Sequence, residues 1–383
     1  MREPNAAIAG CGAITAVGCG VDKLLAALRA NASGLCANEK FNSPRFQSSI
    51  VGAAPRNFDD ENPAWFLAAE ALKEAREPSR NILEKIPAER IGLVLATTKA
   101  NVEALERISE NRLCSDSARR HLQGNFLAED LAAEFDVRGP VQCVSTACVS
   151  GLIAIQQGAK MIQRGEADAV FVVGVDCLSE FVVAGFTALK AIDPDGCQPF
   201  DKNRCGLSPG EAGAAIVLVR ENFAPDSSIK IRGWGGSNDA NHLTGPSRDG
   251  SGLAQAIRAA LNSAKLSPQE IDYVNAHGTG TPYNDAMESL ALKIIFGDAC
   301  PPFSGLKGML GHTLGAAGVV ETIACVLAMQ NNFLPGTPRL NLPADGVPKN
   351  LLREPLFGAC VKNVLKLNTG FGGVNGALIL NHG

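Results

Sequence analysis

The sequence predicts an α/β fold made of two similar halves. Residues 139–176 have the pattern strand, helix, strand, and such β-α-β units form parallel sheets. Residues 271–381 again alternate strands, glycine-rich loops and helices. The 46% hydrophobic content is spread along the chain, and only a short breaker-rich stretch at 221–228 separates the two parts. We therefore expect one body with an N-terminal half, residues 1–222, and a C-terminal half, residues 223–383.

The elements of the first half follow from its apolar spacing. A strand and a glycine-rich turn at 6–20 lead into a helix closed by Gly34, and a second helix at 62–76 has Asn62 placed to cap it and Pro63 at its first position. A buried strand is expected at 90–97. Charged helices at 101–135 are expected to form a lid or cap over the core. The β-α-β unit then comprises strand 139–145, helix 149–165 and strand 167–176.

The second half is read in the same way. Strands 212–219 and 229–236 are expected to be neighbours, followed by an amphipathic helix at 252–266. A strand at 271–281 runs into a glycine-rich loop, and a helix follows at 285–297. A further apolar helix ends at Met329, and two strands at 361–381 enclose a tight glycine turn.

Composition excludes several classes of function. The net charge is −4 with dispersed basic residues, so neither a nucleic-acid surface nor a polybasic membrane anchor is indicated. No apolar run approaches the roughly 20 residues of a membrane span. The segment before Cys11 is too short for a lipoprotein signal, which leaves a strand. The 12 cysteines and five histidines lack disulfide-framework or metal-ligand spacing, which predicts reduced thiols, a cytoplasmic location and no structural metal.

Cys148 occupies the corner between the strand and the helix of the β-α-β unit. A helix N-terminus favours negative charge, so this position predicts a lowered thiol pKa and a nucleophilic thiolate. Thr146, Ala147 and Gly151 are small enough to allow a sharp turn and close approach of a substrate. Because an arbitrary cysteine is more often a buried structural residue, the corner alone leaves both interpretations open.

Two histidines in glycine-rich loops provide partners for a nucleophile. His277 lies in "NAHGTGT" after a strand, and His312 lies in "KGMLGHTLGAAG" before a helix. Either alone is more often structural, but imidazole is the side chain best suited to proton transfer near neutral pH. Two in equivalent loops favour a shared site.

Three further residues extend the candidate site. Lys307 shares the loop of His312, and Glu321 lies in an apolar helix where a buried carboxylate needs a cation, for which Lys307 is the obvious candidate. Phe371 lies in "NTGFGGVN", which is either a plain glycine hairpin or a loop whose bare N–H faces a reacting carbonyl while the ring acts as a gate.

Taken in order, these motifs resemble the β-ketoacyl-acyl carrier protein synthases of the elongating Cys-His-His type, in the thiolase superfamily. The similar segments are "STACVSG", "QPFDKNRCGLSPGEAGA", "SNDANHLTGPSRDG", "NAHGTGTPYNDAMES", "SGLKGMLGHTLGAAG" and "NTGFGGVNGALIL", which span nearly the whole chain. The resemblance implies a five-layer α-β-α-β-α fold built from two pseudo-equivalent halves. It also implies a dimer formed through strands near the nucleophile.

The resemblance further implies a decarboxylative Claisen condensation in fatty acid or polyketide biosynthesis. Cys148 would hold an acyl group as a thioester, with the N–H groups of Cys148 and Phe371 as the oxyanion hole. His277 and His312 would assist decarboxylation of a malonyl unit on acyl carrier protein. Thr279 and Thr281 resemble contacts to the carrier's phosphopantetheine, and Lys307 with Glu321 resembles the pair that orients the site. No other cofactor is implied.

Some positions depart from the family pattern, and alternatives stay open. Cys205, Leu207 and Ala212 replace an acid, an aromatic residue and a glycine, and Asn284 stands where glycine is frequent, which affects the expected acyl pocket. The chain could instead be a non-catalytic partner of a synthase heterodimer, such as a chain-length factor, although those typically lack the cysteine. An acyltransferase or malonyl decarboxylase is a third possibility. A thiolase is disfavoured because "NTGFGG" replaces its second cysteine.

Overall fold

The computed structural model describes residues 6–383, and its main feature is a mixed eleven-stranded sheet. In spatial order the strands are β11 (Phe303–Ser304), β10 (Tyr273–Asn275), β14 (Asn363–Gly370), β15 (Val374–His382), β9 (Ile229–Asn238), β1 (Ala6–Thr15), β8 (Ala212–Arg220), β7 (Ala169–Asp176), β5 (Ile91–Ala96) and β6 (Val141–Val144), with β2 (Gly18–Cys19) paired to β1. The expected β-α-β unit is confirmed, because β6 and β7 both run parallel to β5, one on each side of it.

The sheet consists of two halves that meet at a narrow seam. β1 and β9 pair only at Ala6 and Ala7, whereas β1 pairs with β8 along almost its whole length. The expectation that strands 212–219 and 229–236 are neighbours is wrong, because the first strand of the chain lies between them. The N-terminal strand takes that place because its residues Ala6 and Ile8 pack in the same core as Ile216 of the first segment and Ile231 of the second.

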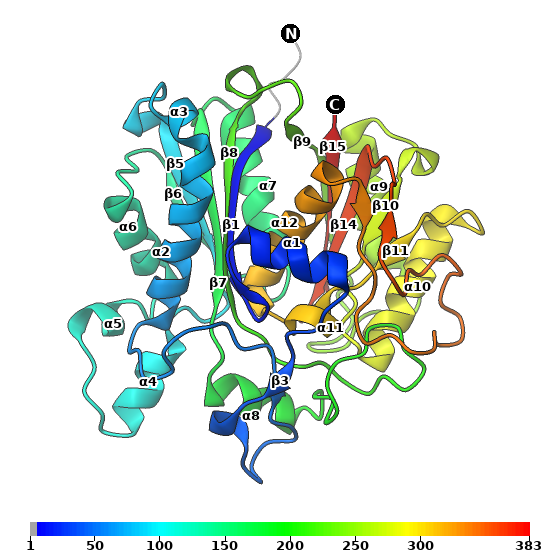
Figure 1. Ribbon diagram of the computed structural model, residues 1–383, viewed down its shortest axis with the longest axis horizontal. Helices are drawn as coiled ribbons and strands as arrows, with labels where there is room; N and C mark the ends of the chain where they lie inside the picture. The colour runs from blue at the N-terminus through cyan, green and yellow to red at the C-terminus, as the bar shows by residue number, and fades with distance from the viewer. Residues whose placement is uncertain (1–5) are drawn as a thin grey trace.

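Helices lie outside each half-sheet and between the two, which gives the layer order α-β-α-β-α (Figure 1). The central layer contains α7 (Ser150–Gln163) and α12 (Ala317–Gln330), which contact strands of both halves and each other. On one outer face α2 (Pro63–Arg76) and α6 (Gly124–Glu134) cover the first half-sheet. On the other face α9 (Ser251–Ala264) packs on β9 and β15, and α10 (Pro282–Phe296) packs on α9.

Burial patterns explain this placement. In α12 every residue from Ala317 to Met329 is buried, as expected for a helix that is apolar all round and enclosed by protein. β7 is buried at all its positions because helices cover both of its faces. β9 instead alternates buried and partly buried residues along Ile229–Trp234. Ile229 and Ile231 belong to the core between the half-sheets, whereas Gly233 lies against Ala264 of α9. The fold therefore has one core between the half-sheets and one beneath each outer layer.

The remaining elements are short and lie around this frame. They are α1 (Val21–Ala30), β3 (Cys36–Ala37) paired with β4 (Ile50–Val51), α3 (Arg80–Leu83), α4 (Val102–Ser109), α5 (Asp116–Arg120), α8 (Glu180–Ala188), α11 (Lys307–Leu310) and β12 (Phe333–Leu334) paired with β13 (Leu356–Phe357).

Two details differ from the sequence-based expectations. The segment 101–135 is not a uniform cap, since α6 packs on β5 and β6 as part of the outer layer while α4 and α5 lie beyond it. Asn62 makes no capping hydrogen bond. Its amide contacts the His121 ring at 2.9 Å instead, because a buried imidazole needs a polar partner.

Over the described residues no helix has the length and apolar character that crossing a membrane requires.

Candidate active site

The corner that carries Cys148 is a strained turn between β6 and α7. Ala147 has φ of 50°, a left-handed conformation that is costly for a residue with a Cβ. The turn places Cys148 two residues before α7, with its side chain at the wall of a cavity. The residue is only 8% exposed. The predicted elbow is therefore present, and its thiol opens toward the cavity.

Close contact between the two central helices brings this corner to the second half of the chain. A Cβ on Gly151 would lie 2.8 Å from the Gly315 carbonyl oxygen, and a Cβ on Gly318 would lie 2.3 Å from the Leu152 nitrogen. Both distances are too short for any side chain. The small residues noted around Cys148 thus allow α7 and α12 to touch backbone to backbone.

His277 follows β10, and buried carboxylates at the start of α10 hold its loop. Glu288 accepts the backbone N–H of His277 at 2.6 Å and that of Gly278 at 2.7 Å. Asp285 accepts the backbone N–H of Thr279 at 3.0 Å. With the Gly280 N–H, which also donates to Asp285, the loop donates four N–H groups to two carboxylates. It therefore cannot rotate freely, and the direction of the imidazole is fixed.

His312 is held by a different segment. Its backbone N–H donates to the Ser208 carbonyl at 2.7 Å, and its own carbonyl accepts from the Gly210 N–H at 3.0 Å. Ser208 and Gly210 belong to the stretch "RCGLSPGEAGA", which therefore positions His312.

The fold brings the nucleophile and both histidines together. The Sγ atom of Cys148 and one ring nitrogen from each of His277 and His312 lie within 4.8 Å of one another. The two imidazoles meet edge to face, with ring centroids 5.1 Å apart. All three residues are buried. Cys148 thus forms one cluster with two histidines that lie more than 100 positions later in the chain.

Both imidazoles are neutral at physiological pH. Burial lowers the pKa of His277 and of His312 well below the ordinary value of 6.5, and the nearby Lys307 ammonium lowers both further. The Nδ1 atom of His277 lies 3.0 Å from Lys307 Nζ and 3.0 Å from the Asn368 amide nitrogen, which are both donors. The Nδ1 atom of His312 accepts the Leu314 N–H at 3.3 Å. The proton of each ring is therefore on Nε2.

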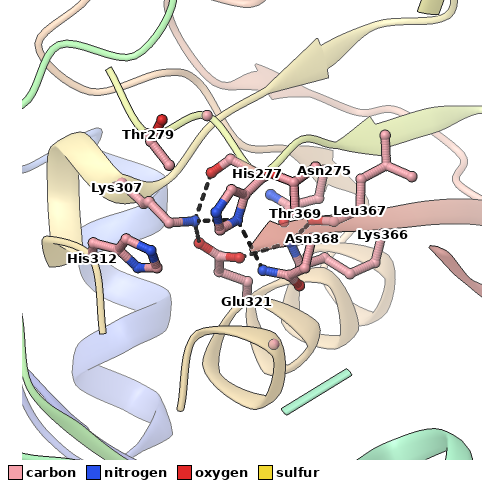
Figure 2. A network of polar contacts seen from close by, with 12 residues as sticks. Asn275, His277, Thr279, Lys307, His312, Glu321, Lys366, Leu367, Asn368 and Thr369 are labelled. Carbon is pink, nitrogen blue, oxygen red and sulfur yellow. Dashed lines mark hydrogen bonds and ion pairs between the residues drawn. The ribbon is translucent and has the colours of Figure 1, made fainter. Parts of the chain in front are cut away.

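A buried ion-pair cluster lies behind His277 (Figure 2). Lys307 Nζ donates to the His277 carbonyl at 2.6 Å and to Glu321 Oε1 at 2.7 Å. Lys366 Nζ lies 2.6 Å from the other oxygen of that carboxylate, Oε2. Burial opposes the charge of Glu321, but the two ammonium groups outweigh it and lower the Glu321 pKa overall. The predicted contact between Lys307 and Glu321 is present.

The expected lowering of the Cys148 pKa is wrong for the free protein. Burial raises the pKa of this thiol to about 11, and Asp176 adds to the increase, while Lys307 and the Phe371 backbone N–H act in the opposite direction. Cys148 is therefore a protonated thiol until a substrate approaches.

Cys148, His277 and His312 also have the side chains and spacing of a metal site. Ligating histidines almost always donate their other ring N–H to a protein group or water, whereas here the Nδ1 atoms accept hydrogen bonds. With its proton on Nε2, each ring has no lone pair left for a metal. This hydrogen-bond pattern favours proton chemistry, and the absence of a structural metal stays a prediction.

The cluster opens into a cavity of about 460 Å³. Phe371, between β14 and β15, lines it and is 37% exposed, with its ring centroid 6.1 Å from that of Phe186. Thr279 and Thr281 also line it, with their hydroxyl oxygens 2.8 Å apart. The predicted gate and both threonines therefore face the same cavity as the sulfur.

Family models match both parts of the chain. "Beta-ketoacyl synthase, N-terminal domain" matches residues 6–224, and "Beta-ketoacyl synthase, C-terminal domain" matches residues 229–341. The chain belongs to the β-ketoacyl synthase family.

Curated members of the β-ketoacyl synthase family resemble the chain over most of its length. The 3-oxoacyl-[acyl-carrier-protein] synthase 2 of Coxiella burnetii is 30% identical over 100% of this chain and 99% of its own. The tetracenomycin polyketide synthase ketoacyl synthase alpha subunit of Streptomyces glaucescens is 34% identical over 86% of this chain and 83% of its own.

Solved structures of β-ketoacyl synthases share the fold. The ishigamide ketosynthase/chain length factor has a TM-score of 0.92 at 28% identity and covers 100% of both chains. A ketosynthase in complex with its chain length factor from Xenorhabdus doucetiae has a TM-score of 0.88 at 29% identity, covering 99% of this chain and 98% of that one. The thiolase-like architecture is confirmed.

The positions that depart from the synthase pattern lie at or near the cavity. Asn284 is a cavity wall residue and accepts the Thr369 hydroxyl at 2.6 Å, so it fills space that a glycine would leave open. Cys205 and Leu207 also line the cavity. Burial and Asp193 raise the pKa of the Cys205 thiol to about 11. Ala212 is buried at the start of β8 and is not a cavity wall.

Several residues that position the synthase site were missed. Lys366, Asn368, Asp285 and Glu288 all contact the His277 loop or the ion-pair cluster. Lys366 could have been identified from the sequence, since a lysine within the apolar strand "NVLKLNTG" is expected to be buried and to need a charged partner. Asp285 and Glu288 were harder to identify, since acidic residues in the first turns of a helix are common because they interact favourably with the helix dipole.

Proposed function

We propose that this chain is a β-ketoacyl-acyl carrier protein synthase that catalyses decarboxylative Claisen condensation in fatty acid or polyketide biosynthesis. The observation that carries the proposal is the cluster of the Cys148 sulfur with two neutral imidazoles at one cavity. A non-catalytic partner subunit would need no such cluster. The family and its curated relatives support the same activity.

In the first half-reaction Cys148 attacks the thioester of an acyl group carried on acyl carrier protein. A bond forms between the sulfur and the acyl carbon, the bond to the carrier sulfur breaks, and the thiol proton leaves with the pantetheine thiol. The backbone N–H of Phe371 already points at the Cys148 sulfur, and with that of Cys148 it would stabilise the oxyanion.

In the second half-reaction a malonyl thioester on a second carrier molecule occupies the cavity. The Nε2–H groups of His277 and His312 donate to its thioester carbonyl. Loss of carbon dioxide leaves an enolate, whose carbon attacks the acyl carbonyl on Cys148. A carbon–carbon bond forms, the bond between the Cys148 sulfur and the acyl carbon breaks, and the released thiolate takes a proton from solvent. Neutral imidazoles stabilise the enolate oxygen without binding the carboxylate in its ground state.

The substrates reach this site on phosphopantetheine, and the proposal requires no other cofactor. Thr279 and Thr281 are suited to hydrogen-bond the amides of that arm, because their hydroxyl groups face the cavity. Lys307 and Glu321 would orient His277, and Phe371 would gate access to Cys148. Acyl carrier protein is therefore the proposed partner in both half-reactions.

We also propose a dimer through the free edge of β6, either with a second copy or with a related synthase-like subunit. Within residues 6–383 β6 pairs only with β5, and its edge lies beside the Cys148 corner. Two similar solved structures contain a ketosynthase together with a chain length factor, which supports a related synthase-like subunit as the second partner. All 12 cysteines lie in the described part of the chain and none forms a disulfide there, which fits the proposed cytoplasmic setting. The division into halves at 222/223 stays a prediction.

Mass spectrometry tests the proposal. The purified protein is mixed with a set of acyl carrier proteins, and Cys148 is expected to gain an acyl group that the matched variants C148A and C148S do not carry. Adding malonyl carrier should then release a 3-ketoacyl product. An acyl adduct without this product would indicate an acyltransferase, and carbon dioxide release alone would indicate a decarboxylase. Activity that a chelator abolishes would reopen the metal interpretation of the cluster.

A further inference from the structure

Lys366 is a second buried ammonium group in the ion-pair cluster, and the two half-reactions do not use it. It lies in β14, its side chain is fully buried, and its Nζ atom is 2.6 Å from Glu321 Oε2. It also donates to the carbonyl of Leu367. Figure 2 shows the Glu321 carboxylate between the two lysine side chains. Lys307 alone would neutralise Glu321, so Lys366 needs a different explanation.

Packing does not explain this lysine. Its strand neighbours Val364, Leu365 and Leu367 are apolar and buried, so a neutral side chain of similar size would suit the site. Burying an ammonium group costs several kcal/mol of desolvation before any pairing, and replacing buried ion pairs by apolar residues is often neutral or stabilising. The charge itself is therefore the feature to explain.

Lys366 and Asn368 act on the same face of the strand. Residues two apart in a strand point to one side, and Asn368 donates to His277 Nδ1 at 3.0 Å. Lys366 reaches His277 through Glu321 and Lys307, and Lys307 donates to that same Nδ1 atom. β14 therefore contributes two adjacent side chains to the rear of the catalytic imidazole, one directly and one through the ion pair.

The charge balance of the cluster is positive. Two ammonium groups face one carboxylate, a net charge of +1 behind two imidazoles. Other charged or titratable groups also surround His277. Close to it are Lys307 of α11, Glu321 of α12, Lys366 of β14, and Asp285 and Glu288 of α10, together with His312 and Cys148. The Lys99–Asp176 ion pair lies farther away. Glu288 contributes less negative charge than its position suggests, because burial and Asp285 raise its pKa to about 7.

We propose that Lys366 is a positioning residue of the condensation site, which holds Glu321 by its far oxygen so that Lys307 faces His277 and supplies the excess positive charge that disfavours protonation of the imidazoles. This inference rests on the proposed function. The direction of the pKa changes agrees with it, since Lys366 is among the groups that lower the pKa of His277 and of His312. A protonated imidazole would bind the malonyl carboxylate and oppose its loss.

The substitution K366M tests the role of the charge. Removing one positive charge should raise the pKa of His277, so the acid limb of decarboxylation of malonyl carrier protein should move to higher pH, by about one unit. At a fixed pH on this acid limb, below the wild-type pKa of His277, kcat should fall by roughly tenfold with little change in KM, because the loss affects the reacting centre. The matched control K362M removes an exposed lysine just before the same strand and should leave the profile unchanged.

Two further variants separate charge from structure. K366Q keeps hydrogen-bonding capacity toward Glu321 and Leu367 and decides the matter if K366M does not fold. It should show the same shift, and a wild-type profile in K366Q would overturn the inference. The double variant K366M/E321Q restores the net charge of +1 through Lys307 alone. Its acid limb should return toward that of the wild type, whereas persistence of the K366M shift would contradict the charge argument.

A measurement without substrate distinguishes this inference from the proposed function. The ring nitrogens of His277, followed by NMR during a pH titration of the folded protein, should titrate at higher pH in K366M than in wild type. An unchanged titration overturns the role of Lys366 even if condensation is confirmed. If the wild-type protein does not decarboxylate malonyl carrier, the proposed function fails, while a shifted titration still supports the electrostatic role.

Discussion

At the scale of single residues, the site depends on side chains kept in uncharged forms by burial. Cys148 is a thiol and His277 and His312 are neutral, although charged groups lie within a few ångströms. A thiolate–imidazolium pair is therefore not the resting state. Each neutral ring instead directs a fixed Nε2–H outward, as stabilisation of an enolate requires.

The lowered histidine pKa makes a prediction about stability. Below pH 6.5 the unfolded chain binds a proton at His312, whereas the folded protein keeps this histidine neutral. Proton binding therefore stabilises the unfolded state, and the free energy of unfolding falls as the pH drops below 6.5. Relative to H312N, the wild-type unfolding free energy should drop by about 1.4 kcal/mol between pH 7.5 and 5.5. Urea unfolding at both pH values measures this. A difference in unfolding free energy between wild type and H312N that is the same at both pH values would contradict the argument.

At the scale of elements, the catalytic loop is held by the helix that follows it. Both oxygens of Glu288 accept backbone N–H groups of the His277 loop, and Asn284 donates to the same carboxylate at 2.9 Å. Side chains of α10 thus orient the His277 imidazole by binding the backbone of its loop, without contacting the ring itself.

E288Q is expected to disorganise that loop. An amide can accept only through its one oxygen, so one buried N–H loses its acceptor, at a cost of about 1–3 kcal/mol. We expect a comparable loss in unfolding free energy and a fall in kcat of roughly tenfold or more, measured by denaturation and by the condensation assay. The control D298N, at an exposed acid beyond the same helix, should match wild type. Full activity in E288Q would show that the loop needs no support from α10.

The crossing of α7 and α12 carries a second prediction at this scale. G318A places a Cβ within 2.3 Å of the Leu152 backbone nitrogen, so the helices must separate. Destabilisation by about 2 kcal/mol is expected, together with weaker acylation of Cys148, because the corner and His312 move apart. Thermal unfolding and intact-mass analysis report the two effects.

The matched control for the helix crossing is G185A in α8. A Cβ there meets no atom within 4 Å, so this variant should be neutral or stabilised by up to about 1 kcal/mol. If both glycine variants have wild-type stability, backbone contact at the crossing is not required.

At the scale of the whole molecule, the site combines residues from both halves of the chain. The sulfur comes from the first half and the imidazoles from the second, and the central helices connect them. β6 forms the outer edge of the first half-sheet. The Pro140 carbonyl accepts the N–H of Leu93 in β5, and the Val144 carbonyl accepts the N–H of Thr97 just after β5. By the alternation of a strand, the backbone N–H of Cys143 therefore points away from β5.

C143P should weaken the dimer proposed above. Proline removes the outward N–H at Cys143 but leaves the ladder with β5, so the fold should survive at this edge position. Size-exclusion chromatography with light scattering should show more monomer than for wild type. C143S keeps the N–H and should remain dimeric. A dimer that tolerates both substitutions would be formed through another surface.

Features that depend on residues close together in the chain could be predicted from the sequence. Hydrophobic periodicity located the strands and helices, and the loops of His277 and His312 and the corner of Cys148 were identified as places where side chains are presented. The resemblance to a known family supplied roles for them. The neighbours of β1 were not predictable, because pairing across the seam depends on how both half-sheets pack on α7 and α12.

By itself, then, the sequence determined the α/β class, the order of elements and the identity of the candidate catalytic side chains, because these depend on contacts between residues close along the chain. Only the tertiary structure decided their charge states and their support. Burial reversed the expected pKa shift of Cys148, and it added Lys366 behind Glu321. Desolvation and long-range ion pairing are properties of the folded environment, and no local pattern in the chain encodes them.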